Sequence, residues 1–296
     1  MTHLHRLSLA TSLVGALLAS AALAQSGSVV APGATPEVLS DSFTFTEGPI
    51  ADARGNVYFT DIPANRIHVW TTEGELQMFR DQTNATNGLF FDASGMLYGA
   101  EGGTGRVTRM DPDGNVTVVV DECNGAPFNS PNDLWVDADG GIYFTDPRYG
   151  IESNLPQPGY YVYYVAPGSS DAKLIIDDLV RPNGIIGTRD GNTLYVADHQ
   201  GDQTYAYTIS APGELTDKRL LIEQGSDGMA LDEHGNIYLT GRTDITVYSP
   251  EGELLETITF PLAPANMTFG GPDGDVLYVT ARSTLFALQM NVKGMW

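Results

Sequence analysis

The sequence predicts an all-β fold, a six-bladed β-propeller with four-stranded blades. Three observations support this prediction: one motif recurs six times, each repeat contains about four short strand signals, and helix signals are nearly absent. A doubly wound α/β fold would need helices between its strands, and an open sandwich would not require a sixfold repeat.

The repeated motif is an Asp/Gly turn followed by a short β-branched or apolar run that contains a tyrosine. Its six copies are DARGNVYFT (52–60), DASGMLYGA (92–100), DADGGIYFT (137–145), RDGNTLYVA (189–197), DEHGNIYLT (232–240) and PDGDVLYVT (272–280). The tyrosines are Tyr58, Tyr98, Tyr143, Tyr195, Tyr238 and Tyr278, and they lie 40 to 52 residues apart. This spacing is typical of one propeller blade.

The strands between the motif copies complete the blades. For example, NRIHVW (65–70) and LQMF (76–79) flank the turn TEGE. The last repeat runs out after STLFALQM (283–290) and lacks an outer strand, whereas PEVLSDSF (36–43) precedes the first repeat without a partner. We therefore expect the N-terminal strand to complete the last blade and close the ring.

Residues 1–24 have the pattern of a secretory signal peptide: a weakly basic start, an apolar middle, and small residues at Ala22 and Ala24. The apolar run from Leu13 to Ala24 is too short to span a bilayer. The sequence therefore predicts an exported protein, periplasmic or secreted, with residues 25–296 as a single propeller domain.

Composition limits the classes of partner. Residues 1–24 contain one charged side chain, Arg6. Without them the chain has 14 basic and 37 acidic residues, a formal charge of −23. Such a surface repels nucleic acid and anionic lipid, so we expect a small-molecule partner and a monomer or weak oligomer. Cys123 is the sole cysteine, which rules out an internal disulfide and suggests a structural thiol.

One polar residue opens the strand that leads into each repeated turn, 11 or 12 residues before the tyrosine. These residues are Glu47, Asn87, Asn132, Asn183, Asp227 and Asn266. Because the first strand of a blade lines the channel of a propeller, we expect them to converge near the axis. Asn-Gly and Asp-Gly also form ordinary turns, and this reading could account for Asn87 or Asn266 singly. It does not account for the set, because each repeat already has its turn downstream.

All six side chains present oxygen, which indicates a cation site. Packed carboxylates without Lys or Arg among them favour a divalent cation between them. Ca²⁺ is the preferred ion because it takes six to eight oxygen ligands in flexible geometry, with Zn²⁺, Mn²⁺ and Mg²⁺ as alternatives. The predicted ligands are the Glu47 and Asp227 carboxylates and the Asn132 and Asn183 amides.

At these residues the chain resembles the gluconolactonase, senescence marker protein (regucalcin) and luciferin-regenerating enzyme family. The resemblance rests on TEGP (46–49), SPND (130–133), FTDPRYG (144–150), RPNG (181–184) and SDGM (226–229), in that order. It implies a six-bladed propeller with a divalent cation at Glu47, Asn183 and Asp227, and Asn132 in contact with metal or substrate. It also implies hydrolysis of a sugar-acid lactone, with Asp227 as proton acceptor and donor.

Further candidate substrate contacts are Asn87, Arg148, Tyr149 and His199. Arg148 and Tyr149 belong to a loop of the third blade, and His199 follows the fourth repeat strand at the same strand end as Asp61 and Asp146. No G-x-S-x-G nucleophile elbow occurs. Two alternatives stay open: a hydrolase of another lactone or ester, as in paraoxonase-like proteins, and a binding module that uses Ca²⁺ only for structure.

Overall fold

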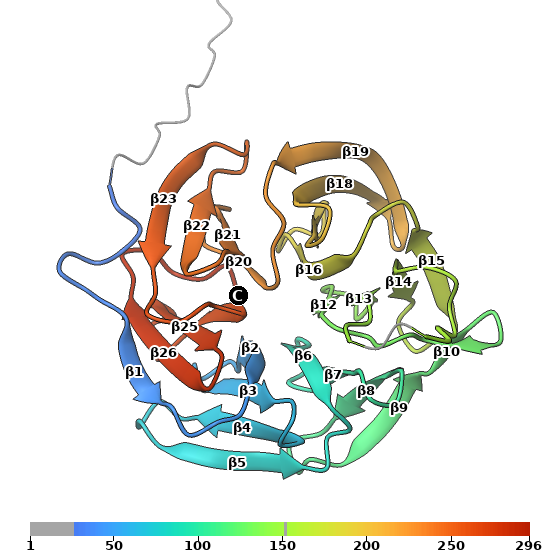
Figure 1. Ribbon diagram of the computed structural model, residues 1–296, viewed down its shortest axis with the longest axis horizontal. Coiled ribbons are helices and arrows are strands. Elements are labelled where there is room, and N and C mark those ends of the chain that lie inside the picture. The colour runs from blue at the N-terminus through green and yellow to red at the C-terminus, as the bar shows by residue number, and fades with distance from the viewer. Residues whose placement is uncertain (1–26, 151–152) are drawn as a thin grey trace, which may run out of the picture.

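The computed structural model describes residues 27–150 and 153–296, and its regular structure consists of β-strands. The predicted signal peptide, residues 1–24, lies outside the described residues. Six antiparallel four-stranded sheets stand in a ring around a central axis (Figure 1). The predicted six-bladed propeller is confirmed. No helix of the described residues is long and apolar enough to cross a bilayer.

The first four blades follow the chain from the inner strand outward. The first comprises β2 (Thr46–Ala51), β3 (Val57–Asp61), β4 (Arg66–Trp70) and β5 (Leu76–Asp81). The second comprises β6 (Thr86–Phe91), β7 (Leu97–Glu101), β8 (Arg106–Met110) and β9 (Val116–Val120). A short hairpin, β10 (Glu122–Cys123) with β11 (Ala126–Pro127), precedes the third, β12 (Leu134–Val136), β13 (Ile142–Asp146), β14 (Tyr161–Val165) and β15 (Ala172–Ile176). The fourth comprises β16 (Pro182–Gly187), β17 (Thr193–Asp198), β18 (Gln203–Ala211) and β19 (Glu214–Ile222).

The last blade is completed from both ends of the chain. The fifth blade comprises β20 (Met229–Leu231), β21 (Ile237–Thr240), β22 (Asp244–Tyr248) and β23 (Leu254–Thr259). The sixth contains β24 (Asn266–Gly270), β25 (Val276–Ala281) and β26 (Thr284–Gln289), with β1 (Glu37–Ser40) paired antiparallel to β26 as its outer strand. This pairing confirms the predicted ring closure (Figure 1). It joins the chain ends to one sheet, so the ring cannot open without breaking a ladder.

The aspartate of the repeated turns accepts hydrogen bonds from backbone N–H groups of the turn. In four of them the carboxylate accepts hydrogen bonds from the N–H groups two and four residues further on, at 2.7 to 3.0 Å; the residues are Asp52, Asp92, Asp137 and Asp232. Such side-chain to backbone bonds replace part of the ladder at the turn. The Asp/Gly motif is thus a local structural device.

The repeat tyrosines pack between blades. Tyr58 meets Phe91 of the second blade edge-on with ring centroids 5.1 Å apart, and Tyr238 meets Phe269 of the sixth blade at 5.3 Å. Trp135 is 1% exposed and packs on Tyr143, as a core residue. Cys123 is buried too, as expected of a structural thiol. The interfaces between blades fix the inner strands, whose starts carry the predicted site.

Candidate active site

Five of the six repeated polar residues occupy the same register at the start of an inner strand. Each lies three residues before the residue that pairs with the repeat tyrosine. The pairs are Ile50 with Tyr58, Phe90 with Tyr98, Trp135 with Tyr143, Ile186 with Tyr195, and Ala230 with Tyr238. Glu47, Asn87, Asn132, Asn183 and Asp227 therefore form one layer around the axis, here called the upper ring.

The prediction that Asn266 belongs to this set is wrong by one residue. In the sixth blade Thr268 pairs with Tyr278, so Asn266 lies only two residues before the paired position. The upper-ring position belongs to Ala265, whose N–H donates to Thr280 O at 2.8 Å. The cause is the turn: nine residues separate Thr268 from Tyr278, against seven between the corresponding pair of the first blade.

Asn266 instead shares a second layer with Asp133, one residue further along the inner strands. The other four blades carry glycine at this position, and two of them show why. A Cβ on Gly88 would lie 2.4 Å from Asp133 Oδ1, and one on Gly228 would lie 2.1 Å from Asn266 Cγ. The glycines thus leave room for two polar side chains beneath the upper ring. Asp133 was not among the predicted site residues, although it lies inside the motif SPND (130–133).

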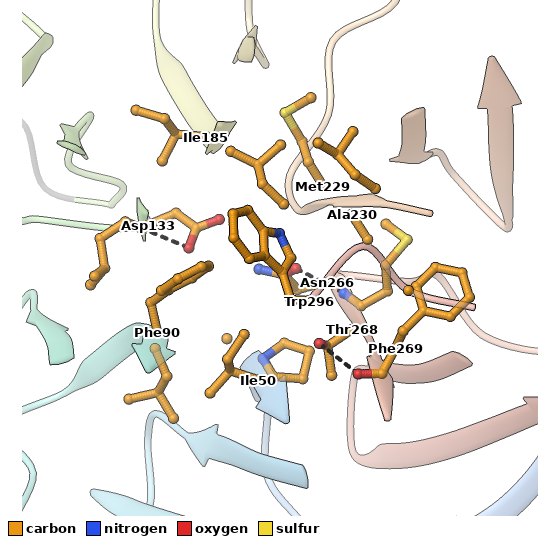
Figure 2. Close-up of a pocket in the computed structure, with 18 of the residues that line it drawn as sticks. Ile50, Phe90, Asp133, Ile185, Met229, Ala230, Asn266, Thr268, Phe269 and Trp296 are labelled. Carbon is orange, nitrogen blue, oxygen red and sulfur yellow. Dashed lines mark hydrogen bonds between the residues drawn. The ribbon is translucent and has the colours of Figure 1, made fainter. Parts of the chain in front are cut away.

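The base of the channel is apolar and is covered by Trp296. A cavity of about 40 Å³ lies there, bordered by the Asp133 and Asn266 side chains and by apolar residues of the inner strands. Figure 2 shows the Trp296 indole in the midst of Asp133, Asn266 and Phe90. Its ring meets Phe90 edge-on at 5.9 Å. Aromatic burial on this side keeps the axial carboxyl groups in a poorly solvated environment.

Three carboxyl groups close to the axis have raised pKa values. Burial raises the pKa of Glu47 well above its usual range, and the negative charge of Asp227 raises it further. Burial also raises the pKa of Asp227, although His199 and the Asn183 amide oppose the shift. Burial raises the pKa of Asp133 to about 7. Carboxylates that repel one another in a desolvated channel are stabilised by a cation placed between them.

The donor set fits such a cation. The Asn183 amide donates from Nδ2 to Asp227 Oδ1 at 2.6 Å, and Asn183 Oδ1 is buried without a hydrogen-bond partner among the described residues. An unpartnered buried carbonyl oxygen on a residue that hydrogen-bonds a carboxylate is a candidate ligand. The described residues contain no group of three or more His, Cys, Asp or Glu side chains placed to hold a metal. A cation held here would draw on amide oxygens as well as carboxylates, a donor set that suits Ca²⁺ better than a structural zinc.

The upper ring opens into a cavity of about 770 Å³. Its walls include Asn87, Asn132, Arg148, Tyr149 and His199 together with Glu47 and Asp227. Asn183 joins this group through its bond to Asp227. The structure thus brings together all the candidate metal and substrate residues of the sequence. The cavity wall also includes apolar residues: Phe45, Ile62, Pro63, Pro127 and Pro156.

A second set of carboxylates holds the chain that leads into the inner strands. Asp146 accepts hydrogen bonds from the N–H groups of Asn129 at 2.7 Å and Ser130 at 2.5 Å. Asp61 and Asp198 make the same paired contacts ahead of Glu47 and Asn183. Each stands three residues after a repeat tyrosine, which is a signal present in the sequence. These bonds fix the position of the upper-ring residues along the channel axis.

The fold and the site together define the class of protein: a six-bladed β-propeller with a ring of side-chain oxygen donors on its axis, next to a pocket. The family model described as SMP-30/gluconolactonase/LRE-like region matches residues 45–283. The chain belongs to this family.

Among its relatives is the gluconolactonase of Zymomonas mobilis, 29% identical, with 87% of this chain and 82% of the relative covered. The structure of a gluconolactonase from Xanthomonas campestris matches with a TM-score of 0.83 and 30% identity, covering 88% of this chain and 91% of the other. Regucalcin of Agrobacterium tumefaciens, a calcium-binding protein, shares the fold with a TM-score of 0.73 at 22% identity, covering 87% and 94%.

Proposed function

We propose that the protein is a lactonase that uses a divalent cation, Ca²⁺ in the first instance, to hydrolyse a sugar-acid lactone. The observation that carries the proposal is the upper ring: the Glu47 and Asp227 carboxylates line a 770 Å³ pocket, and Asn183, which hydrogen-bonds Asp227, has a buried oxygen without a partner among the described residues. The gluconolactonase relatives support the reaction class. A purely structural cation would not require its ligands to border a cavity of substrate size.

Glu47, Asn183 and Asp227 would hold the cation, with Asn132 as a further ligand or a substrate contact. A cation there supplies Lewis acidity that polarises the lactone carbonyl. Asp227 lines the pocket, and among the described residues its Oδ2 accepts no hydrogen bond. That oxygen takes the proton from the attacking water, a contribution of about 10²- to 10⁴-fold in rate.

After water adds to the carbonyl carbon, the ring C–O bond breaks and Asp227 returns the proton to the departing ring oxygen. The product is a hydroxy acid, which ionises and releases one proton to solvent. Asn87, Arg148 and His199 line the same pocket and would donate hydrogen bonds to substrate hydroxyl groups. They would thereby position the carbonyl over the upper ring.

The apolar residues of the cavity wall favour a second candidate substrate class. Phe45 and Ile62 face the pocket beside three prolines, and such walls suit a lactone with an alkyl or aryl substituent better than a bare polyol. The reaction would be the same lactone hydrolysis, and only the substituent on the lactone ring that contacts the apolar wall would differ. Comparison of sugar lactones with alkyl and aryl lactones in one assay decides between the two classes.

The test is acid release at constant pH by purified protein on glucono- and xylono-lactones, before and after chelation of divalent cations. The proposal predicts release that chelation stops and added Ca²⁺ restores. Release that survives complete chelation would contradict the role of the cation. Folded protein that binds Ca²⁺ and releases acid from none of these lactones would move the assignment to a binding module.

We further propose that the protein works outside the cytoplasm, on the strength of the signal-like residues 1–24. Fractionation of cells producing the full chain, with N-terminal sequencing of the product, tests this. Cleavage before Gln25 is expected, and an intact chain in the cytoplasm would contradict it.

A further inference from the structure

The orientation of the Asn183 amide is fixed by two acceptors. Its Nδ2 donates one hydrogen to Asp227 Oδ1 at 2.6 Å and the other to the Tyr149 hydroxyl at 2.8 Å. Both amide hydrogens are then used, which directs Oδ1 away from these acceptors. Asn183 is 1% exposed, so no bulk water competes for the amide.

The Tyr149 hydroxyl is held in turn by its own partners. Because it accepts from Asn183, its proton is available for His199 Nδ1, which lies 3.2 Å away. The Arg181 guanidinium carbon stands 5.2 Å from the centroid of the Tyr149 ring and 4.5 Å from that of Tyr160. Hydrogen bond and cation–π contact together fix the phenol from two sides.

The phenol thereby completes a chain from His199 through Tyr149 to Asn183 and Asp227. Carbonyl and carboxylate ligands of metals are commonly oriented by such outer hydrogen bonds, and their loss weakens metal binding. If the Asn183 amide turned over, its oxygen would face the Asp227 carboxylate, which can only accept, and that repulsion disfavours the orientation. The Tyr149 phenol could donate to the turned oxygen only by giving up its contact with His199 Nδ1.

We infer that Tyr149 is a positioning residue that holds Asn183 Oδ1 ready for the cation, in place of the substrate contact that the sequence suggests for it. The inference rests on the cation site of the proposed function, and on no particular substrate. Tyr149 acts through Asn183, and its removal should change metal affinity before it changes substrate affinity.

The chain offers a matched control in Tyr160. Its hydroxyl accepts from Arg181 Nη2 at 3.1 Å and its ring lies against the same guanidinium. Among the described residues the Asn183 amide donates to Tyr149 and Asp227, and not to Tyr160. Tyr149→Phe and Tyr160→Phe each remove one phenol oxygen beside Arg181. Only the first removes an acceptor of the Asn183 amide.

The experiment titrates Ca²⁺ alone into chelator-stripped full-length protein by isothermal calorimetry. We expect Tyr149→Phe to raise the Kd about 10- to 100-fold and Tyr160→Phe to change it by less than about twofold. Melting temperatures of the metal-free variants, measured in parallel, show whether each still folds. With Ca²⁺ in saturating excess, the KM of Tyr149→Phe for a hydrolysed lactone should return close to that of the wild type.

An unchanged Kd with a raised KM would overturn the inference and make Tyr149 a substrate contact. Equal Kd shifts in both variants would overturn it too, because they would point to a general effect through Arg181. Wild-type protein that binds no Ca²⁺ overturns it at the outset. A Kd shift confined to Tyr149→Phe supports it even if no lactone is hydrolysed, so failure of the lactonase proposal remains distinguishable.

Discussion

Substituting the buried Asp133 should stabilise the metal-free protein at high pH. The carboxyl group has a pKa of about 7 in the fold because it is buried, against 3.8 for an ordinary aspartate. The folded state therefore binds the proton more tightly than the unfolded state, and this group makes folding less favourable as pH rises through the interval. Asparagine keeps the oxygen that accepts from Leu134 N–H at 2.9 Å and removes the titrating charge.

The magnitude follows from linkage between protonation and folding. With these two pKa values, titration of Asp133 lowers the free energy of unfolding by roughly 4 kcal/mol at pH 8 and by roughly 2 kcal/mol at pH 5. Relative to wild type, Asp133→Asn should therefore gain about 2 to 3 kcal/mol in free energy of unfolding between pH 5 and pH 8. For a domain of this size that corresponds to about 4 to 5 °C in melting temperature.

The assay is thermal unfolding in the presence of a chelator, at half-unit steps from pH 5 to pH 8. It compares the wild type, Asp133→Asn and the control Asp41→Asn. Asp41 is exposed, so its variant should follow the wild-type curve. A difference between Asp133→Asn and wild type that stays constant across this range would refute the reasoning. So would a difference that shrinks as pH rises.

Three further predictions concern the axis. Ca²⁺ affinity should fall as pH is lowered from 8 to 5.5, and binding at pH 6 should release protons, because the raised pKa values of Glu47 and Asp227 let protons compete with the cation. Calorimetry in buffers of different ionisation enthalpy measures the released protons, and pH-independent binding would contradict the prediction. Gly88→Ala should destabilise the protein by about 1 to 3 kcal/mol in urea unfolding, because the new methyl group would lie 2.4 Å from Asp133 Oδ1. The control Gly27→Ala should leave stability unchanged, because no atom lies within 4 Å of the added methyl group. Trp296→Ala should lower the free energy of unfolding by about 2 kcal/mol in the same assay, roughly half the value for a fully buried aromatic side chain, because Trp296 is 46% exposed. An unchanged stability would show that the indole does not cover the channel base.

Periodicity predicted most of the fold and the upper ring, because both repeat once per blade. The Asp/Gly turns, the inner-strand starts and the unpaired segment at residues 36–43 carry local signals that need no knowledge of tertiary contacts. The same rule failed at Asn266, where a longer turn shifts the register by one residue at nearly constant sequence spacing. Only strand pairing reveals that Ala265 takes the upper-ring position.

Other parts of the site lie outside any periodic pattern. Asp133 occurs at a position where four blades have glycine, and the need for that glycine becomes visible only when neighbouring blades approach within van der Waals distance. The contact between Tyr149 and Asn183 joins residues 34 positions apart in different blades. Trp296 reaches the axis by the path of the last residues after β26, which no local preference determines.

The most direct test of the account is a crystal structure of the protein soaked with Mn²⁺ as an anomalous scatterer, followed by Ca²⁺ in competition. The account predicts one strong anomalous peak on the axis, within coordination distance of Glu47, Asn183 Oδ1 and Asp227, that Ca²⁺ removes and that leaves a ligand position open to the 770 Å³ pocket. A peak elsewhere, or an ion with its ligand shell closed by protein atoms, would contradict the proposed catalytic centre.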